Sequence, residues 1–289
     1  MADRNMVARV AVAAVAIPTL FGVVWLGGWP LALLVAAAAA LGARELLGIG
    51  AAAGIRGHAP LALGAAAAWP LLAYLETTRW PESAASAAML ALVAALWVVV
   101  VLTATLARRT PQERPLEAAA LTVLAPLYAG LLPGTLLAIR HASHPMRDWA
   151  GTWLVFFPLV TTWVCDSVAM QVGRAVGGAK LAPTVSPGKT WSGTIGGFVG
   201  ALAVAPVFVL LVFRPLGVPV GFGAALAIAG TVGVMGQVGD LVESLVKRQA
   251  GVKDSSHLIP GHGGVLDRLD SLYFVLPLAT ILYHLFGII

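Results

Sequence analysis

The densest group of charged side chains lies near the C-terminal end of the 289-residue sequence. Asp240, Glu243 and Lys247 follow one another at spacings of three and four, which place all three on one face of a helix. After a Pro-Gly turn, Asp267 and Asp270 lie three residues apart and share a face of a second helix. Two carboxylates that point the same way repel each other unless a cation lies between them. Because Mg²⁺ takes carboxylate oxygens, water and substrate phosphates as ligands, the pattern favours a magnesium site. The alternative for the first three residues is a charged helix end balanced by its own ion pair.

A further carboxylate, Asp166, stands inside the segment TTWVCDSVAMQVGR, which is otherwise almost apolar. An ionised aspartate at membrane depth costs about 2.5 kcal/mol or more. We therefore expect Asp166 to face water or the protein interior and to have a cationic or metal partner. The alternative is an aspartate at a helix end that reaches the membrane interface.

Residues 180–197 read KLAPTVSPGKTWSGTIGG and contain a Gly-Lys-Thr triplet that is typical of phosphate-binding loops. A Walker motif is excluded because Pro183 stands where that motif needs glycine and no strand is expected before it. What is left is Ser186, Lys189 and Thr190 directly ahead of a helix, whose free N–H groups and positive end suit an anion. The stretch therefore predicts a phosphate cradle, with a helix cap and a topology-setting lysine as the alternative.

Cationic and glycine residues accompany the carboxylates. Gly263 and Gly264 would let the backbone approach a phosphate closely, and the neighbouring His262 suits a base, a phosphate donor or a simple turn residue. Carboxylates for a metal, cations for phosphate charge and a glycine turn are together the requirements of phosphoryl or nucleotidyl transfer. The cations are Lys189, Lys247, Arg248, Lys253 and Arg268.

The elements that carry these residues are predicted to be membrane helices. The sequence is 59% hydrophobic and 11% charged, and apolar runs approach the roughly 20 residues that cross a bilayer. No segment is polar enough to cover a separate water-soluble core, so residues 1–289 are expected to form one membrane domain. Cys165 is the single cysteine, which excludes an internal disulfide and every metal motif built on a cysteine pair. The first apolar run is expected to be a retained helix rather than a cleaved signal peptide.

The predicted fold class is all-α, a polytopic transmembrane helix bundle of about nine spans with a cytoplasmic N-terminus. Four of the 18 basic residues, Arg79, Arg140, Arg147 and Arg214, fall outside on this assignment and the other fourteen inside, as the positive-inside rule requires. The most polar loops, at 108–116, 173–190 and 240–268, then all face the cytoplasm. The basic excess is a topology signal that also attracts anionic lipid, so no nucleic-acid partner is expected. The spans lie at about 7–26, 29–48, 59–75, 84–107, 117–139, 149–172, 191–213, 217–238 and 269–288.

The glycines near these segments favour close helix packing. Gly230, Gly233, Gly236 and Gly239 recur three apart on one helix and end beside Asp240. Small residues at such spacings let helix backbones approach closely in lipid. We expect this glycine ridge to hold the Asp240 carboxylate rigidly.

Taken together, the motifs resemble those of the integral-membrane phosphatidate cytidylyltransferases, also called CDP-diacylglycerol synthases. CDSVAMQVGR, SPGKTWSG and GDLVES are similar to further segments of that family, although Met170 and Ser192 depart from its common residues. Residues 149–289 carry the resemblance as catalytic helices and cytoplasmic loops, whereas residues 1–140 share only apolar character. The family signature reads here Ser244, Val246, Lys247, Arg248, Lys253, Asp254, His262, Gly263, Gly264, Asp267, Arg268 and Asp270.

The resemblance implies that CTP and phosphatidate react to give CDP-diacylglycerol and pyrophosphate. On this reading Mg²⁺, with a second cation such as K⁺ beside it, is held by Asp240, Asp267 and Asp270, with Asp166 as a nearby fourth carboxylate. Other expected partners are membrane lipids and a second copy of the chain in a homodimer, in a bacterial cytoplasmic membrane. The residues assigned to catalysis are Asp240, Lys247, Arg248, Asp267, Arg268 and Asp270. The residues assigned to substrate binding are Ser186, Lys189, Thr190, Ser244, Lys253, His262, Gly263 and Gly264.

Two other functions are compatible with the same residues. A CTP-dependent transferase acting on another lipid phosphate would share the nucleotide and metal machinery and differ in its lipid pocket. A cation-coupled transporter would use Asp166, Asp240 and the 267/270 pair as an ion path. The clustering of most charges at one face, with more cations than an ion path needs, favours the enzyme.

Overall fold

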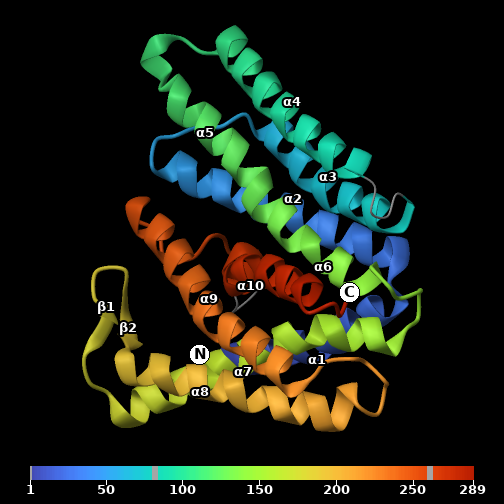
Figure 1. Cartoon of the computed structure of the whole chain (residues 1–289). Coiled ribbons are helices and arrows are strands. Elements are labelled where there is room, and N and C mark those ends of the chain that lie inside the picture. The colour runs from blue at the N-terminus through green and yellow to red at the C-terminus, as the bar shows by residue number, and fades with distance from the viewer. Residues whose placement is uncertain (1, 80–83, 259–262) are drawn as a thin grey trace.

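A computed structural model of the chain describes residues 2–79, 84–258 and 263–289, and most of this described chain is helical (Figure 1). A π-helical turn, Leu127–Leu131, joins α5 to α6, and a second, Val209–Phe213, extends α8. A 3₁₀ turn, Pro111–Glu113, precedes α5. The α-helices are α1 (Ala2–Leu26), α2 (Gly28–Ala52), α3 (Ala59–Arg79), α4 (Ala84–Arg108), α5 (Pro115–Pro126), α6 (Leu132–His141), α7 (Trp149–Val176), α8 (Trp191–Phe208), α9 (Phe222–Gln249) and α10 (Leu266–Leu285).

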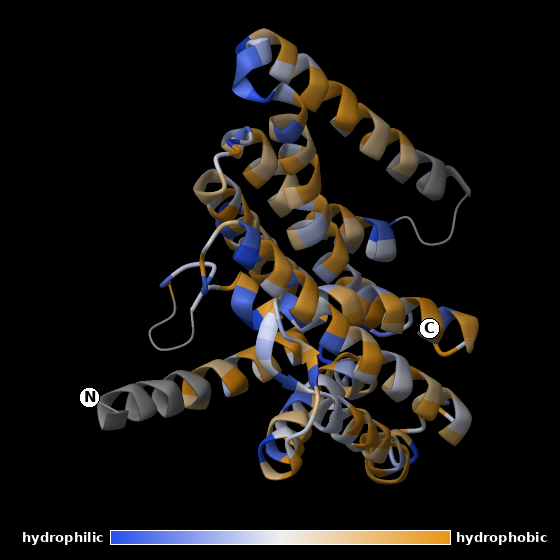
Figure 2. Ribbon diagram, turned by 90° about the vertical axis from the view of Figure 1, so that its left-hand side faces the viewer, coloured by the Kyte–Doolittle hydropathy of each residue, from blue (hydrophilic) through white to orange (hydrophobic). Residues whose placement is uncertain are grey.

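Seven helical segments within the described residues are long and apolar enough to cross a membrane. They are α2, α3, α4, the continuous run from α5 to α6, α7, α8 with its π-helical turn, and α9. Figure 2 shows that apolar residues cover most of the helices, whereas hydrophilic residues gather at helix ends and connections. The predicted all-α polytopic bundle is thereby confirmed, while the count of nine spans and the side of the N-terminus stay predictions.

The helices pack around two clusters of buried apolar side chains. One cluster joins α7, α8 and α9 through residues such as Phe157, Phe208 and Ile228. The other joins α2, α3 and α5 around residues such as Ala62 and Ala125. Both α2 and α10 contribute to both clusters, so these two helices tie the N-terminal helices to the C-terminal ones.

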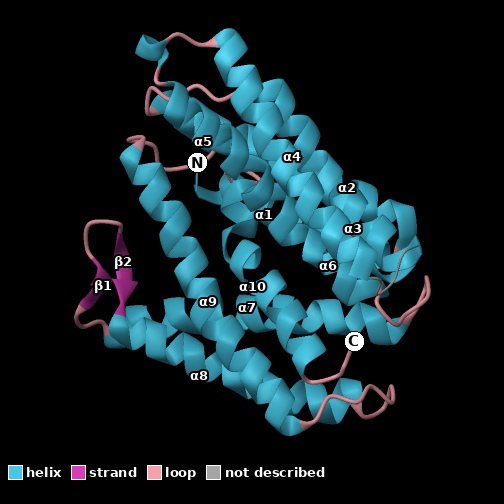
Figure 3. Ribbon diagram, turned by 45° about the horizontal axis from the view of Figure 1, so that its top comes forward, coloured by secondary structure: helices cyan, strands magenta, loops and turns pink. Residues whose placement is uncertain are grey.

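The predicted loop at 173–190 contains the β-structure of the described chain, an antiparallel hairpin of β1 (Lys180–Ala182) and β2 (Ser186–Thr190) (Figure 3). This is a departure from the all-helical expectation. Two glycines with positive φ, Gly177 and Gly178, end α7 and let the chain reverse into β1. A turn that begins with Pro183, whose φ is already fixed, then returns the chain along β2 to the start of α8.

The expected glycine ridge on α9 lies at helix contacts. A Cβ atom on Gly239 would lie 2.7 Å from the backbone oxygen of Asp270, so only glycine allows α9 and α10 to approach this closely. On the same ridge, a Cβ on Gly233 would lie 2.8 Å from the Cβ of Ala201 in α8. The approach at Gly239 brings its neighbour Asp240 to the side of α10 that carries Asp270.

Candidate active site

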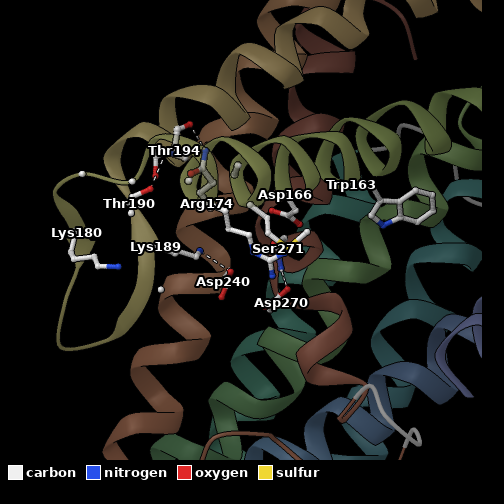
Figure 4. A pocket seen from close by; sticks show the side chains of 18 of the residues that line it. Trp163, Asp166, Arg174, Lys180, Lys189, Thr190, Thr194, Asp240, Asp270 and Ser271 are labelled. Carbon is white, nitrogen blue, oxygen red and sulfur yellow. Dashed lines mark hydrogen bonds and ion pairs between the residues drawn. The ribbon is translucent and has the colours of Figure 1, made fainter. Parts of the chain in front are cut away.

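A cavity of about 830 Å³ opens where the C-terminal end of α7, the β1–β2 hairpin, α8, α9 and the start of α10 meet (Figure 4). Its lining includes all four predicted carboxylates, Asp166, Asp240, Asp267 and Asp270, although they come from three helices. The cations in the lining are Arg174, Lys180, Lys189 and Arg268. The cavity therefore combines acidic and basic side chains at the ends of apolar helices.

The hairpin aims Lys189 at Asp240. The Lys189 Nζ atom lies 2.7 Å from Asp240 Oδ2, and Ser244 Oγ donates to the other carboxylate oxygen at 3.3 Å. Thr190, the next residue, is the N-cap of α8, where its Oγ1 accepts a hydrogen bond from the Gly193 N–H at 3.1 Å. Because a helix cap fixes the end of β2, the position of Lys189 is determined by both the hairpin and α8.

Ser192, one of the two departures from the family pattern, closes the base of this hairpin. Its hydroxyl donates to the backbone oxygen of Gly177 and lies 3.1 Å from Thr190 Oγ1. The side chain therefore joins the end of α7 to the start of α8. Met170, the other departure, lies in the cavity lining and is 51% exposed, so an apolar surface borders the charged residues.

Asp267 is held by hydrogen bonds on both of its carboxylate oxygens. Lys247 Nζ lies 2.6 Å from Oδ1, while Oδ2 accepts from the Ser255 N–H, the Ser255 hydroxyl and the Gly264 N–H, each at 2.8 Å. Burial by itself would raise the pKa of Asp267, which precedes the predicted span 269–288. The hydrogen bonds from Lys247, Gly264 and Ser255 outweigh burial and hold that pKa well below its usual range. Asp267 is therefore ionised at neutral pH.

Lys247 serves two carboxylates at once. Besides Asp267, it lies 3.0 Å from Oε1 of Glu243, whose side chain is only 1% exposed. The predicted alternative, a helix end balanced by its own ion pair, thus describes part of the observed geometry. Lys247 lies behind the cavity rather than in its described lining, which makes it a support for Asp267 in this structure.

Asp166 and Asp270 face the cavity without an ion pair to any lysine, arginine or histidine in the described parts of the chain. Asp270 accepts only the N–H of its neighbour Ser271 there, at 2.7 Å. Among the described residues, no three His, Cys, Asp or Glu side chains lie close enough together to enclose a metal ion. The set instead fits Mg²⁺, which takes one or two carboxylates and completes its shell with water and phosphate oxygens.

Several predicted residues have structural contacts outside the cavity. Arg248 donates to the backbone oxygen of Val185 at 3.3 Å and so ties the tip of the hairpin to the end of α9. Ser186 pairs with Ala182 within the hairpin, and neither it nor Lys253 belongs to the described lining. His262 lies outside the residues that the structure describes.

Gly263 and Gly264, the glycine pair of the family signature, are required by the conformation of the loop that precedes α10. Gly263 has a φ of +80°, and a Cβ there would lie 2.7 Å from Asp267 Oδ2. A Cβ on Gly264 would collide with the Ser255 hydroxyl and with the carboxylate of Glu45 in α2. Both glycines therefore let the loop close around two carboxylates, whether or not they also meet a substrate.

Sequence reasoning missed three charged residues around the site. Arg174 lies eight residues after Asp166 on α7, a spacing of slightly more than two turns that could have revealed a shared face. Lys180 lies opposite Thr190 in the hairpin and also lines the cavity. Glu45 lies about 200 positions away in the sequence, and no local pattern connected it to this site.

The fold and the cavity define a polytopic helical membrane protein with a charged site suited to a phosphate-bearing substrate. The chain matches the model of the Cytidylyltransferase family over residues 7–286, and it belongs to this family. The resemblance noted in the sequence is thereby confirmed.

Relatives from several bacteria match part of the chain. The chain is 41% identical over 164 residues to the phosphatidate cytidylyltransferase of Haemophilus influenzae. This match covers 57% of this chain and 55% of the relative. The chain is 41% identical over 164 residues to the enzyme of that name from Bacillus subtilis, or 57% and 58% of the two chains. For the one from Brucella abortus the identity is 47% over 162 residues, or 56% and 55%. The chain thus spans about half the length of the curated relatives it matches.

Proposed function

We propose that this chain is a phosphatidate cytidylyltransferase that joins CTP and phosphatidate to form CDP-diacylglycerol and pyrophosphate. A phosphate oxygen of phosphatidate attacks the α-phosphorus of CTP, a new P–O bond forms, and the bond from the α-phosphorus to the bridging oxygen of the leaving pyrophosphate breaks. The attacking phosphate is already an anion at neutral pH, so the reaction requires no strong general base. The observation that carries the proposal is the cavity that brings together all four predicted carboxylates with Lys189 and Arg268 of the family motifs.

The cations of the cavity suit the triphosphate. Arg174, Lys180, Lys189 and Arg268 reach the lining from α7, the hairpin and α10, so they surround the cavity on more than one side. In a cavity bordered by apolar helices, such charges stabilise developing negative charge more strongly than they would in water. We assign them to the phosphates of CTP, with Lys189 leaving Asp240 to do so.

The carboxylates suit a magnesium ion. We propose that Mg²⁺ takes one or two of its ligands at a time from Asp240, Asp267 and Asp270, with Asp166 nearby, and a second cation such as K⁺ stays a prediction. When bound, Mg²⁺ would neutralise phosphate charge and polarise the α-phosphate. Asp270 and Asp166 are open to the cavity and without an ion pair in the described chain, which supports this assignment. Asp267 is already ionised and fixed at the start of α10, which orients its carboxylate in advance.

The site's place in the membrane suits its two substrates. We propose nine spans in a bacterial cytoplasmic membrane, with the N-terminus and the active site on the cytoplasmic side. The hairpin, the C-terminal end of α9 and the connection between α4 and α5 lie toward the same side of the bundle, at the left of Figure 1, which supports this orientation. Phosphatidate would keep its acyl chains in the bilayer, beside exposed apolar residues such as Met170 and Trp163. The homodimer stays a prediction.

A transfer assay with the purified protein tests the proposal. Detergent-solubilised protein is incubated with CTP labelled in its α-phosphate, phosphatidate and Mg²⁺, and both CDP-lipid and pyrophosphate are measured. We expect both products in equal amounts, none with EDTA, and recovery with added Mg²⁺. Parallel reactions with polyprenyl phosphate and with ATP, GTP and UTP test the lipid and the base. Absence of nucleotide transfer to every lipid phosphate would contradict the proposal, and ion flux in liposomes would become the next measurement.

A further inference from the structure

Glu45 of α2 is a buried carboxylate that contacts the signature loop, by which we mean the described residues between the end of α9 and the start of α10, including Ser255 and Ser256. Glu45 is only 6% exposed, and each of its oxygens lies within hydrogen-bond distance of one hydroxyl and one backbone N–H. Oε1 accepts from Ser256 Oγ at 2.7 Å and from the Val265 N–H at 3.1 Å. Oε2 lies 3.0 Å from Ser255 Oγ and accepts from the Leu266 N–H at 2.7 Å. These four contacts lie more than 200 positions away in the sequence.

Two of these contacts cap α10. Val265 is the N-cap residue of α10, and Leu266 is its first helical residue. The side chain of Val265 has no polar atom that could accept a hydrogen bond and cap the helix. The first N–H groups of a helix lack partners within it and favour a negative charge. Glu45 supplies both the hydrogen-bond acceptor and the charge from another helix. Asp267 follows in the first turn of α10, so the Glu45 carboxylate holds the segment from which Asp267 projects.

The other two contacts hold the loop that surrounds Asp267. The Ser255 hydroxyl lies 3.0 Å from Glu45 and 2.8 Å from Asp267, but it has one hydrogen and can donate to only one carboxylate at a time. Glu45 therefore offers this hydroxyl an alternative acceptor whenever Asp267 gives up its own hydrogen bond. Ser256 contacts Glu45 alone among the carboxylates of the described chain, so it anchors the loop independently of Asp267.

We propose that Glu45 is a positioning residue, which fixes the start of α10 and the 255–256 loop so that Asp267 and Asp270 stay aimed into the cavity. Its link to turnover rests on the proposed function, whereas its link to the loop does not. A residue that merely filled the bundle would contact apolar neighbours. Glu45 instead directs every hydrogen bond that it makes in the described chain at the segment carrying the catalytic carboxylates.

Glu45→Gln tests this role because it keeps the size of the side chain and loses one acceptor oxygen. An amide nitrogen would face at least one backbone N–H of α10, since Val265 and Leu266 donate to different oxygens. We expect kcat to fall at least tenfold and trypsin cleavage after the exposed Lys253 in this loop to accelerate severalfold. The matched control is Glu117→Gln, on a glutamate at the start of α5 whose side chain is 42% exposed, and it should change neither.

A double-mutant cycle with Ser256→Ala separates positioning from general stability. Ser256→Ala removes one Glu45 contact without changing the bundle, and we expect a smaller loss of kcat in the same direction. The two changes should combine to less than the product of their separate effects, because they remove the same contact. This variant also tests the proposal if Glu45→Gln fails to fold.

Two results would overturn the proposal. One is an unchanged kcat and an unchanged cleavage rate in Glu45→Gln. The other is a loss of kcat that parallels loss of thermal stability, with normal cleavage after Lys253 and independent effects in the cycle. Should the wild-type protein transfer no nucleotide, the proposed function fails, but cleavage after Lys253 still reports whether Glu45 holds the loop.

Discussion

Replacing Lys247 by methionine should destabilise the fold as well as abolish activity. Lys247 Nζ lies 2.6 Å from Asp267 and 3.0 Å from Glu243, and these two side chains are only 7% and 1% exposed. Methionine keeps most of the side-chain length and removes the charge. The substitution therefore leaves two buried carboxylates facing each other without the cation between them.

The expected loss can be worked out from these contacts. Removing one partner of a buried ion pair typically costs about 3 to 5 kcal/mol, because the other charge is left uncompensated. Asp267 keeps its hydrogen bonds from Ser255 and Gly264, so its share of the loss is the smaller one. Glu243 accepts no other hydrogen bond from the described chain and loses the one cation with which it forms an ion pair there. We expect the free energy of unfolding to fall by about 3 to 5 kcal/mol.

The measurement is the free energy of unfolding in mixed micelles, obtained by titration with a denaturing detergent and followed by fluorescence of the nine tryptophans. Lys253→Met makes the same substitution on an exposed lysine of the neighbouring loop and should stay within about 0.5 kcal/mol of wild type. Adding Glu243→Leu to Lys247→Met should recover much of the loss, since apolar replacement of a buried pair is often neutral.

The opposite result would refute the reasoning. If Lys247→Met unfolds with the wild-type free energy while turnover is lost, Lys247 contacts the substrate and does not hold Glu243 and Asp267. A double variant that is less stable than Lys247→Met alone would also contradict the assigned charge balance.

The remaining predictions concern the cavity and its loop. Asp270→Asn should lower turnover at least about 100-fold, roughly 2.7 kcal/mol of transition-state stabilisation, while the thermal midpoint stays near wild type, because a carboxylate without an ion pair in the described chain is removed. Equal losses of fold and turnover would contradict this. Arg174→Gln should raise the KM for CTP about tenfold with little change in the thermal midpoint, because its charge lies in the cavity lining; an unchanged KM would place the triphosphate elsewhere. Gly264→Ala should cost about 1 to 3 kcal/mol in the free energy of unfolding, because its Cβ collides with Ser255 and Glu45, and a fully stable variant would show that the loop can shift.

The sequence predicted the helical segments well because membrane spans are long and apolar. The predicted spans at 29–48, 59–75 and 149–172 fall within α2, α3 and α7. Their ends were less predictable, since α9 continues to Gln249 through residues whose charges look like a loop in hydropathy alone. The hairpin was missed because three- and five-residue strands carry no hydrophobic alternation.

The contacts between residues of the candidate site were harder to predict than the residues themselves. Helical spacing placed Asp267 and Asp270 on one face, and the structure puts both in one cavity. The spacing did not indicate that Lys247 would lie behind the cavity against Glu243, nor that Arg174 would lie within it. The positions of Lys247 and Arg174 depend on how α7, α9 and α10 cross one another. The local sequence pattern does not determine this crossing.

The sequence by itself determined the class of protein, the family and the residues that carry charge, because composition and motif spacing are properties of the chain. Only the tertiary structure decided which charges neutralise each other and which face a substrate. Asp267 and Asp270 look alike in the sequence, yet one accepts four hydrogen bonds and the other stays open to the cavity. Glu45 shows the same limit most clearly, because its contacts with the signature loop exist only once α2 packs beside the start of α10.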